Sequence, residues 1–245
     1  MQNPAPPPPP AVPALSAAEA TLDRAAPPAA RAAVPVLEAA DLACQRGDRP
    51  LFEHLDLALE PGTVTWLRGR NGRGKTSLLR LLASLATPMA GEISVGGEAV
   101  RRSGAAWRAG LVYIGHQNGL KDDLTASEAL AFLCQLGGRR PSPAEIDGAL
   151  TRLGVGAKRR APVRTLSQGQ RRRVALARLA LALDAPLWLL DEPFDALDTD
   201  GIDALNALLG EHAQRGGATL LTSHQALTLA EPVPRILQLD HHGHA

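Results

Sequence analysis

Short apolar runs alternate along this chain with longer stretches in which apolar residues recur every three or four positions. The short runs, bounded by polar residues or glycine, predict strands, and the wider spacing predicts helices. We predict strands at residues 64–68, 91–95, 111–114, 187–191, 219–223 and 235–239. We predict helices at residues 76–86, 126–136, 168–183 and 201–214. Strands that alternate with helices in this way predict a three-layer α/β core.

The alternation stops between residues 118 and 165, where no strand is predicted. Thr125 and Glu128 match a helix-start signature in which each side chain caps a backbone N–H near the other, and Pro141 and Pro143 break the chain after that helix. We therefore expect residues 118–165 to form a helical subdomain inserted into a domain of residues 35–245. Residues 1–34 are rich in Pro and Ala, so we expect a disordered tail.

One glycine-rich loop lies between a predicted strand and a predicted helix. Residues 69–76 read Gly-Arg-Asn-Gly-Arg-Gly-Lys-Thr, which is the phosphate-loop pattern G-x-x-x-x-G-K-[ST] in the context it needs. Its glycines let backbone N–H groups and the helix N-terminus surround a polyphosphate. Lys75 is expected at the β and γ phosphates, Thr76 on Mg²⁺ and Ser77 on a nearer phosphate oxygen. The candidate contacts of a nucleoside triphosphate are Gly69, Arg70, Asn71, Gly72, Arg73, Gly74, Lys75, Thr76 and Ser77.

The apolar run 187–190 ends in two acidic residues, Asp191 and Glu192. Such a run suits a central parallel strand that is buried on both faces, and ligands of α/β folds bind at the carboxyl ends of these strands. Asp191 is therefore suited to hold Mg²⁺ through water, and Glu192 to polarise an attacking water. An apolar strand that ends in two acids is common by itself, so this interpretation depends on the phosphate loop.

The segment Leu166-Ser167-Gln168-Gly169-Gln170 opens a predicted helix, where unpaired N–H groups favour an anion. It resembles the signature motif of ATP-binding cassette (ABC) proteins, usually Leu-Ser-Gly-Gly-Gln, with Gln168 in place of the first glycine. In that family the signature of one subunit closes over the γ-phosphate held by another. The resemblance therefore implies a dimer of two copies with ATP sandwiched between them, contacted by Ser167, Gly169 and Gln170. A simpler interpretation of Ser167 and Gly169 is a helix cap and a turn.

Three further residues match the ABC pattern. Gln117 resembles the family's Q-loop glutamine, which touches Mg²⁺ and water, and Asp198 resembles the D-loop aspartate, which helps to order the dimer interface. His224 stands at the position of the switch histidine, whose ring can bond the γ-phosphate and orient water. The resemblance thus implies an ATPase in which Glu192, His224 and Gln117 are catalytic. The implied ligands of Mg²⁺ are Thr76, Gln117 and Asp191.

The ABC pattern is incomplete at the expected adenine site. These proteins usually stack adenine on an aromatic residue upstream of the phosphate loop, where this chain has Cys44-Gln45-Arg46-Gly47-Asp48-Arg49. Arg46 or Arg49 is suited to lay a flat guanidinium on adenine, and Phe52, the nearest ring, is the alternative residue to stack on the base. The two arginines fit equally well as solvated loop charges.

Composition restricts the class of protein further. The 245 residues fit one two-lobed domain after the tail, and the two cysteines lack metal-ligand spacing, as in a reducing cytosol. A net charge of +1 argues against general nucleic-acid binding. We interpret the basic clusters 158–160 and 171–173 as solvated helix and loop faces. The sequence has no window of 18 consecutive apolar residues, so it predicts no membrane span.

Five stretches resemble one ABC family in particular, the ATP-binding subunits of the haem exporter of cytochrome c maturation: residues 37–44, 46–52, 113–121, 187–194 and 221–225. The resemblance implies a multispan membrane subunit of the CcmB type and other cytochrome c maturation proteins as partners, with no nucleic acid. It also implies the cytoplasmic face of the inner membrane, and a role in haem delivery or in release of a haem chaperone. The alternatives are a soluble ABC ATPase and a transporter subunit for another substrate.

Overall fold

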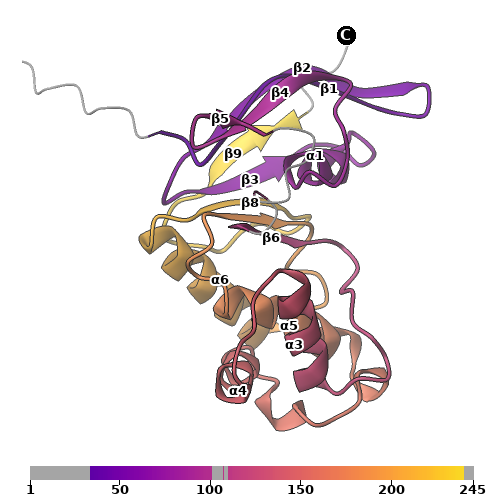
Figure 1. Ribbon diagram of the computed structural model, residues 1–245, viewed down its shortest axis with the longest axis vertical. Helices are drawn as coiled ribbons and strands as arrows, with labels where there is room; N and C mark the ends of the chain where they lie inside the picture. Colours follow the sequence, from indigo (N-terminus) through magenta and orange to yellow (C-terminus); the bar gives the residue numbers. More distant parts are fainter. Residues whose placement is uncertain (1–33, 101–106, 108–109, 240–245) are drawn as a thin grey trace, which may run out of the picture. The chain divides into compact units, whose positions relative to one another are not determined.

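The strands of the computed structural model, which describes residues 34–100, 107 and 110–239, form two sheets (Figure 1). The first is antiparallel, in the order β2-β1-β4-β5, and consists of β1 (Leu37–Arg46), β2 (Arg49–Leu59), β4 (Ala90–Val95) and β5 (Glu98–Ala99). The second is parallel, in the order β6-β7-β8-β3-β9, and consists of β3 (Val64–Arg68), β6 (Leu111–Ile114), β7 (Leu187–Leu190), β8 (Ala218–Thr222) and β9 (Arg235–Gln238). The tail predicted at residues 1–34 lies outside the described residues, except for Val34.

Most helix starts follow from local sequence. The helices are α1 (Lys75–Leu82), α3 (Ala126–Leu136), α4 (Pro143–Arg152), α5 (Gln168–Ala180) and α6 (Thr199–Gln214), with short 3₁₀ turns η1 (Gly156–Lys158) and η2 (Val163–Thr165). The capping box predicted at Thr125 is confirmed at the start of α3. Ser142 and Ser167 form the same box on α4 and α5, and Asp198 caps α6 by accepting from the Gly201 N–H.

The parallel sheet separates two apolar clusters, because its central strands are buried on both faces. All residues of β7 and β8 are buried. Leu187 and Leu189 pack with α1 and the antiparallel sheet, whereas Trp188 and Leu190 pack with the helices below it (Figure 1). The three-layer α/β core predicted from the sequence is confirmed.

The carboxyl ends of four parallel strands meet at one edge of this sheet. Ile114 pairs with Leu190, Leu190 pairs with Leu221, and Leu67 pairs with Thr222. The loops that follow β3, β6, β7 and β8 are therefore neighbours, although they are far apart in the sequence. Nearly every residue singled out from the sequence as part of a site lies on one of these loops or on the start of α1, α5 or α6.

Several sequence-based predictions are wrong in detail. The strands β1, β2 and β5 were not predicted, and the strand expected at residues 91–95 pairs with β1 in the antiparallel sheet. The helix expected at 76–86 ends at Leu82, because Ser84 adopts a left-handed conformation with φ of 53°. The helix expected at 168–183 likewise ends at Ala180.

The segment 118–165 holds α3, α4 and both 3₁₀ turns. The prolines at 141 and 143 do not only break the chain, because Pro143 stands in the first turn of α4 behind the Ser142 cap. Both α3 and α4 pack against α5, which follows this segment. The boundaries of a separate helical subdomain stay a prediction.

Candidate functional site

A cleft of about 570 Å³ opens at the carboxyl end of the parallel sheet. The phosphate loop lines one side with Asn71, Gly72, Gly74, Lys75, Thr76 and Ser77. The acids that follow β7 and two histidines line the other side, namely Asp191, Glu192, Asp195, His116 and His224. The tip of the β1–β2 hairpin closes one end with Arg46, Arg49 and Leu51. The volume and the polar lining suit a nucleotide.

The phosphate loop is shaped by its glycines. Gly72 and Gly74 have φ of 79° and 100°, which a side chain would strain, and Gly74 is also the N-cap of α1. The Lys75 Nζ donates to the backbone carbonyl of Gly69 at 2.7 Å, so the ammonium lies across the loop. The N-terminus of α1 and a lysine point charge together form a site for an anion.

Two hydroxyl groups hold Asp191. The Thr76 Oγ1 donates to Asp191 Oδ2 at 2.8 Å, and the Thr222 Oγ1 donates to Asp191 Oδ1 at 2.9 Å. Asp191 is 3% exposed. A carboxylate and a hydroxyl beside a phosphate loop are oxygen ligands of the kind that Mg²⁺ prefers, and this ion normally takes its other ligands from water and substrate phosphates. The residues present therefore fit Mg²⁺.

Glu192 is a buried carboxylate with an unusual backbone. Its φ is 49°, in the left-handed region, and its N–H donates to Thr222 Oγ1 at 2.8 Å. The His224 N–H donates to Glu192 Oε2 at 2.9 Å, and the His224 Nε2 lies 3.3 Å from Oε1. Burial raises the pKa of Glu192, although the nearby His224 opposes that shift. A carboxylate with a raised pKa accepts a proton more readily, as a general base requires.

The structure does not bring every predicted residue into this cleft. Gln117 is exposed and does not line it, whereas the neighbouring His116 does. Ser167 and Gln170 cap each other at the start of α5, where Ser167 Oγ accepts from the Gln170 N–H at 3.2 Å. Asp198 caps α6 and forms an ion pair with Arg173. The predicted contacts of these residues with a nucleotide, and of Gly169, stay predictions.

The residues suggested for adenine stacking lie at or near the tip of the β1–β2 hairpin. Arg46 ends β1, Arg49 begins β2, and both line the cleft as a directly opposed pair. Phe52 is 1% exposed, and its ring lies under the loop at Gly74. The suggestion that Phe52 stacks on a base is therefore wrong, because that ring is covered by the chain's own packing.

Two residues of this region were missed from the sequence. Thr222 was recognised only as the end of a strand, yet it contacts both Asp191 and Glu192. Arg172 was assigned to a solvated basic cluster, which is wrong, because its side chain is 3% exposed. The available signal was its helical spacing from Leu176 and Leu179, which are buried on the same face of α5.

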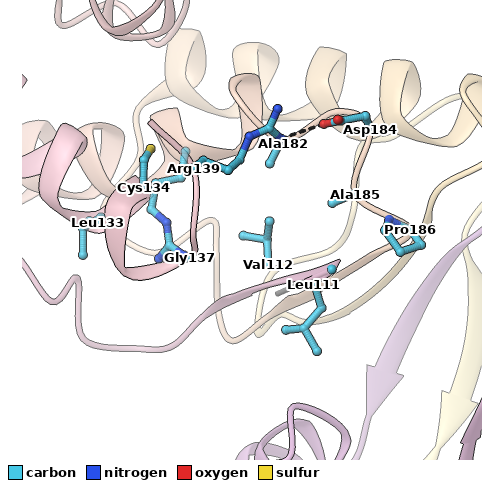
Figure 2. Close-up of a pocket in the computed structure, with 12 residues that line it drawn as sticks. Leu111, Val112, Leu133, Cys134, Gly137, Arg139, Ala182, Asp184, Ala185 and Pro186 are labelled. Atoms are coloured by element: carbon cyan, nitrogen blue, oxygen red, sulfur yellow. Dashed lines mark hydrogen bonds and ion pairs between the residues drawn. The ribbon is translucent and has the colours of Figure 1, made fainter. Parts of the chain in front are cut away.

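A second cavity, of about 350 Å³, lies near the start of β6 and beside α3 and α5 (Figure 2). Figure 2 shows Leu111, Val112, Ala182 and Pro186 around it, together with an ion pair between Arg139 Nη1 and Asp184 Oδ1 at 2.6 Å. Among the described residues that line it, none was predicted as a site residue. The chemistry expected from the sequence therefore belongs to the first cleft.

Of the helices that the structure describes, none has the length and apolar character that crossing a bilayer requires.

Comparison with known proteins agrees with the cleft. The family model of the ABC transporter matches residues 52–195. A cytochrome c biogenesis ATP-binding export protein CcmA 2 from Cupriavidus metallidurans is 47% identical, over 71% of this chain and 82% of the relative. A CcmA protein from Pseudomonas putida is 50% identical, over 71% and 81%. A solved structure of a putative ABC transporter ATP-binding protein from Pyrococcus furiosus has a TM-score of 0.71 at 26% identity, over 85% of this chain and 99% of that one. The chain therefore belongs to the ABC transporter family of ATP-binding proteins, which are ATPases, and within it to the CcmA proteins.

Proposed function

We propose that this chain is the ATP-hydrolysing motor subunit of a membrane ABC complex of cytochrome c maturation. In this role it couples hydrolysis to delivery of haem, or to release of a haem-loaded chaperone, outside the membrane. The observation that carries the proposal is the 44–50% identity to several proteins named as cytochrome c biogenesis ATP-binding export proteins, over more than four fifths of their length. The cleft supports the ATPase part independently of these names.

The phosphate end of the cleft binds the triphosphate of ATP. Backbone N–H groups of residues 69–76 surround the phosphates, and Lys75 exchanges the Gly69 carbonyl for β and γ oxygens. Thr76 and Asp191 would hold Mg²⁺, and Gln117, which does not line the cleft in this structure, would have to turn in from the neighbouring loop to join them. The ion, when bound, neutralises the charge that develops on the phosphates.

Glu192 accepts the proton of the attacking water. Its carboxylate lies in the cleft, burial raises its pKa, and His224 holds it by a backbone N–H and lies within 3.3 Å through its ring. His224 orients the water and bonds the γ-phosphate, since its side chain lines the cleft and is 56% exposed. Hydrolysis then yields ADP and phosphate.

A second copy of the chain completes each site. Ser167, Gly169 and Gln170 do not line the cleft of their own chain. We infer that they contact the γ-phosphate held by the partner copy, and that Asp198 orders the interface between the copies. Two ATP molecules are then sandwiched in the dimer, and an isolated chain is weakly active.

The complex includes a multispan membrane subunit of the CcmB type and other cytochrome c maturation proteins. The chain binds that subunit peripherally at the cytoplasmic face of the inner membrane. The partner holds two copies in register, which raises the effective concentration of each signature at the opposite nucleotide.

A genetic experiment tests the proposal. Deleting the gene, or replacing it with Lys75→Ala, should abolish covalent haem attachment to c-type cytochromes and leave b-type cytochromes intact, because only the former need haem outside the membrane. Haem-stained gels and difference spectra of membranes report both classes. Lys158→Ala, at an exposed position in η1, is the matched control and should behave as wild type.

Normal c-type bands in the deletion strain would exclude cytochrome c maturation and leave a transporter subunit for another substrate. Recovery of the chain with ribosomes or DNA, and not with membranes, would replace the proposal by a soluble ABC ATPase.

A further inference from the structure

Arg172 is a buried cation that joins α5, the helix that begins with the signature motif, to the edge of the parallel sheet where Asp191 and Glu192 lie. It lies on α5, five residues after Ser167, and its side chain is 3% exposed. Its Nη2 donates to the carbonyls of Asp191 at 3.0 Å and of Glu192 at 2.7 Å. Its Nη1 donates to the Gly115 carbonyl at 3.0 Å and to Asn118 Oδ1 at 3.1 Å.

These bonds connect three segments that act on the nucleotide. Asp191 and Glu192 follow β7, Gly115 and Asn118 bracket the loop that carries Gln117, and α5 begins with the signature. The planar guanidinium presents five donors in a fixed geometry, so its bonds to separate loops fix those loops relative to each other. No neutral side chain offers an equivalent set of donors.

The Glu192 backbone needs such support. With φ of 49° it is held in a conformation that non-glycine residues rarely adopt, and such a conformation persists only where surrounding contacts determine it. Thr222 fixes the N–H of Glu192 from β8, and Arg172 fixes its carbonyl from α5. Arg172 therefore acts on the direction of the Glu192 side chain without touching the substrate.

We propose that Arg172 is a positioning residue, which holds Glu192 and the Gln117 loop in a fixed position relative to the signature motif at the start of α5. When the signature contacts a second copy, Arg172 transmits that contact to the Glu192 carboxylate. An α-helix rises about 1.5 Å per residue, so roughly 8 Å of rigid helix separates Ser167 from Arg172. This inference rests on the proposed hydrolytic function.

The test compares Arg172→Met with Arg172→Lys in the full-length chain assembled with its membrane partner. Arg172→Met keeps a long side chain but no donor, so kcat should fall at least about tenfold while the KM for ATP and ATP binding by the isolated full-length chain change less than about twofold. Arg172→Lys keeps the charge and up to three donors, and should recover part of kcat. Arg215→Met, at an exposed position after α6, is the control and should retain wild-type kcat.

A double-mutant cycle separates positioning from general structural support. Because Arg172 acts through Glu192, adding Arg172→Met to Glu192→Gln should reduce the remaining single-turnover rate by less than about twofold. An equal reduction in both backgrounds, or wild-type kcat in Arg172→Met, would overturn the inference. If Arg172→Met does not fold, Arg172→Lys replaces it in the cycle, and either wild-type kcat in Arg172→Lys or an equal reduction of the rate in both backgrounds would overturn the inference. Absence of hydrolysis by the wild-type complex would instead refute the proposed function, and the inference with it.

Discussion

The starts of α1 and α5 carry the two glycine-containing motifs of this chain, but they differ in whether side chains cap them. At α1 the N-cap is Gly74 in a left-handed conformation, and no described side chain caps the helix. At α5 Ser167 and Gln170 form a complete capping box, which already satisfies two of the donors. The first helix start therefore has no described side chain that competes with a phosphate for its N–H groups, whereas the second uses two of its donors internally.

The two motifs also differ in position, because the phosphate loop lines the cleft of its own chain, whereas Ser167, Gly169 and Gln170 do not. Unpaired N–H groups at a helix start bind an anion without losing any internal bond. At α5 the Ser167 Oγ already accepts from the Gln170 N–H, and its O–H remains as a donor for a phosphate. We expect binding to follow the phosphate loop alone, and turnover to follow both motifs.

Glu192→Gln should have the largest effect and leaves both helix starts intact. A general base contributes about 10²–10⁴-fold, so hydrolysis should fall by that factor while ATP binding stays, because Lys75 and the loop amides remain. The variant should also trap an ATP-bound dimer, visible by size-exclusion chromatography. Hydrolysis at the wild-type rate in the assembled complex would show that another group is the base.

Exchanging one residue at each helix start tests the comparison directly. Lys75→Ala removes a charge-assisted bond, so ATP binding by the isolated chain should weaken about 10–100-fold, measured by calorimetry. Ser167→Ala should leave that binding constant unchanged, lower the free energy of unfolding by about 1 kcal/mol through loss of the cap, and reduce hydrolysis in the dimer. Equal losses of binding in the two variants would contradict a signature that acts on a second copy.

The pH dependence of turnover should test whether Glu192 is the group that accepts the proton. Burial raises the pKa of Glu192, and only its ionised form accepts a proton. The kcat should therefore be constant above the raised pKa and fall about tenfold per pH unit as the pH decreases through it. The residual hydrolysis of Glu192→Gln is the control. If the rates of the wild type and of Glu192→Gln decrease at the same acidic pH, the decrease belongs to the ionisation of ATP and not to Glu192.

Motifs with local causes were predictable from the sequence. The phosphate loop needs only glycines and a lysine between a strand and a helix, and the boxes at Thr125 and Ser167 need residues three positions apart. The antiparallel sheet was not predicted, because a bulge around Asp41, whose φ is 52°, shifts the register of β1 and breaks its two-residue period. A local pattern of apolar and polar residues predicts such a strand only where the two-residue period is maintained.

The sequence by itself determined which residues are candidates for the chemistry: Lys75, Thr76, Asp191, Glu192 and His224 stand at strand ends or in a loop whose type predicts their roles. Only the tertiary structure decided which of these residues meet, because the register of the parallel strands places Thr76 on Asp191 and His224 on Glu192 across large separations. It also buried Arg172 in the protein interior and left Gln117 outside the cleft. Burial depends on what packs against a residue, and Arg172 can be buried because backbone carbonyls of distant loops converge on it.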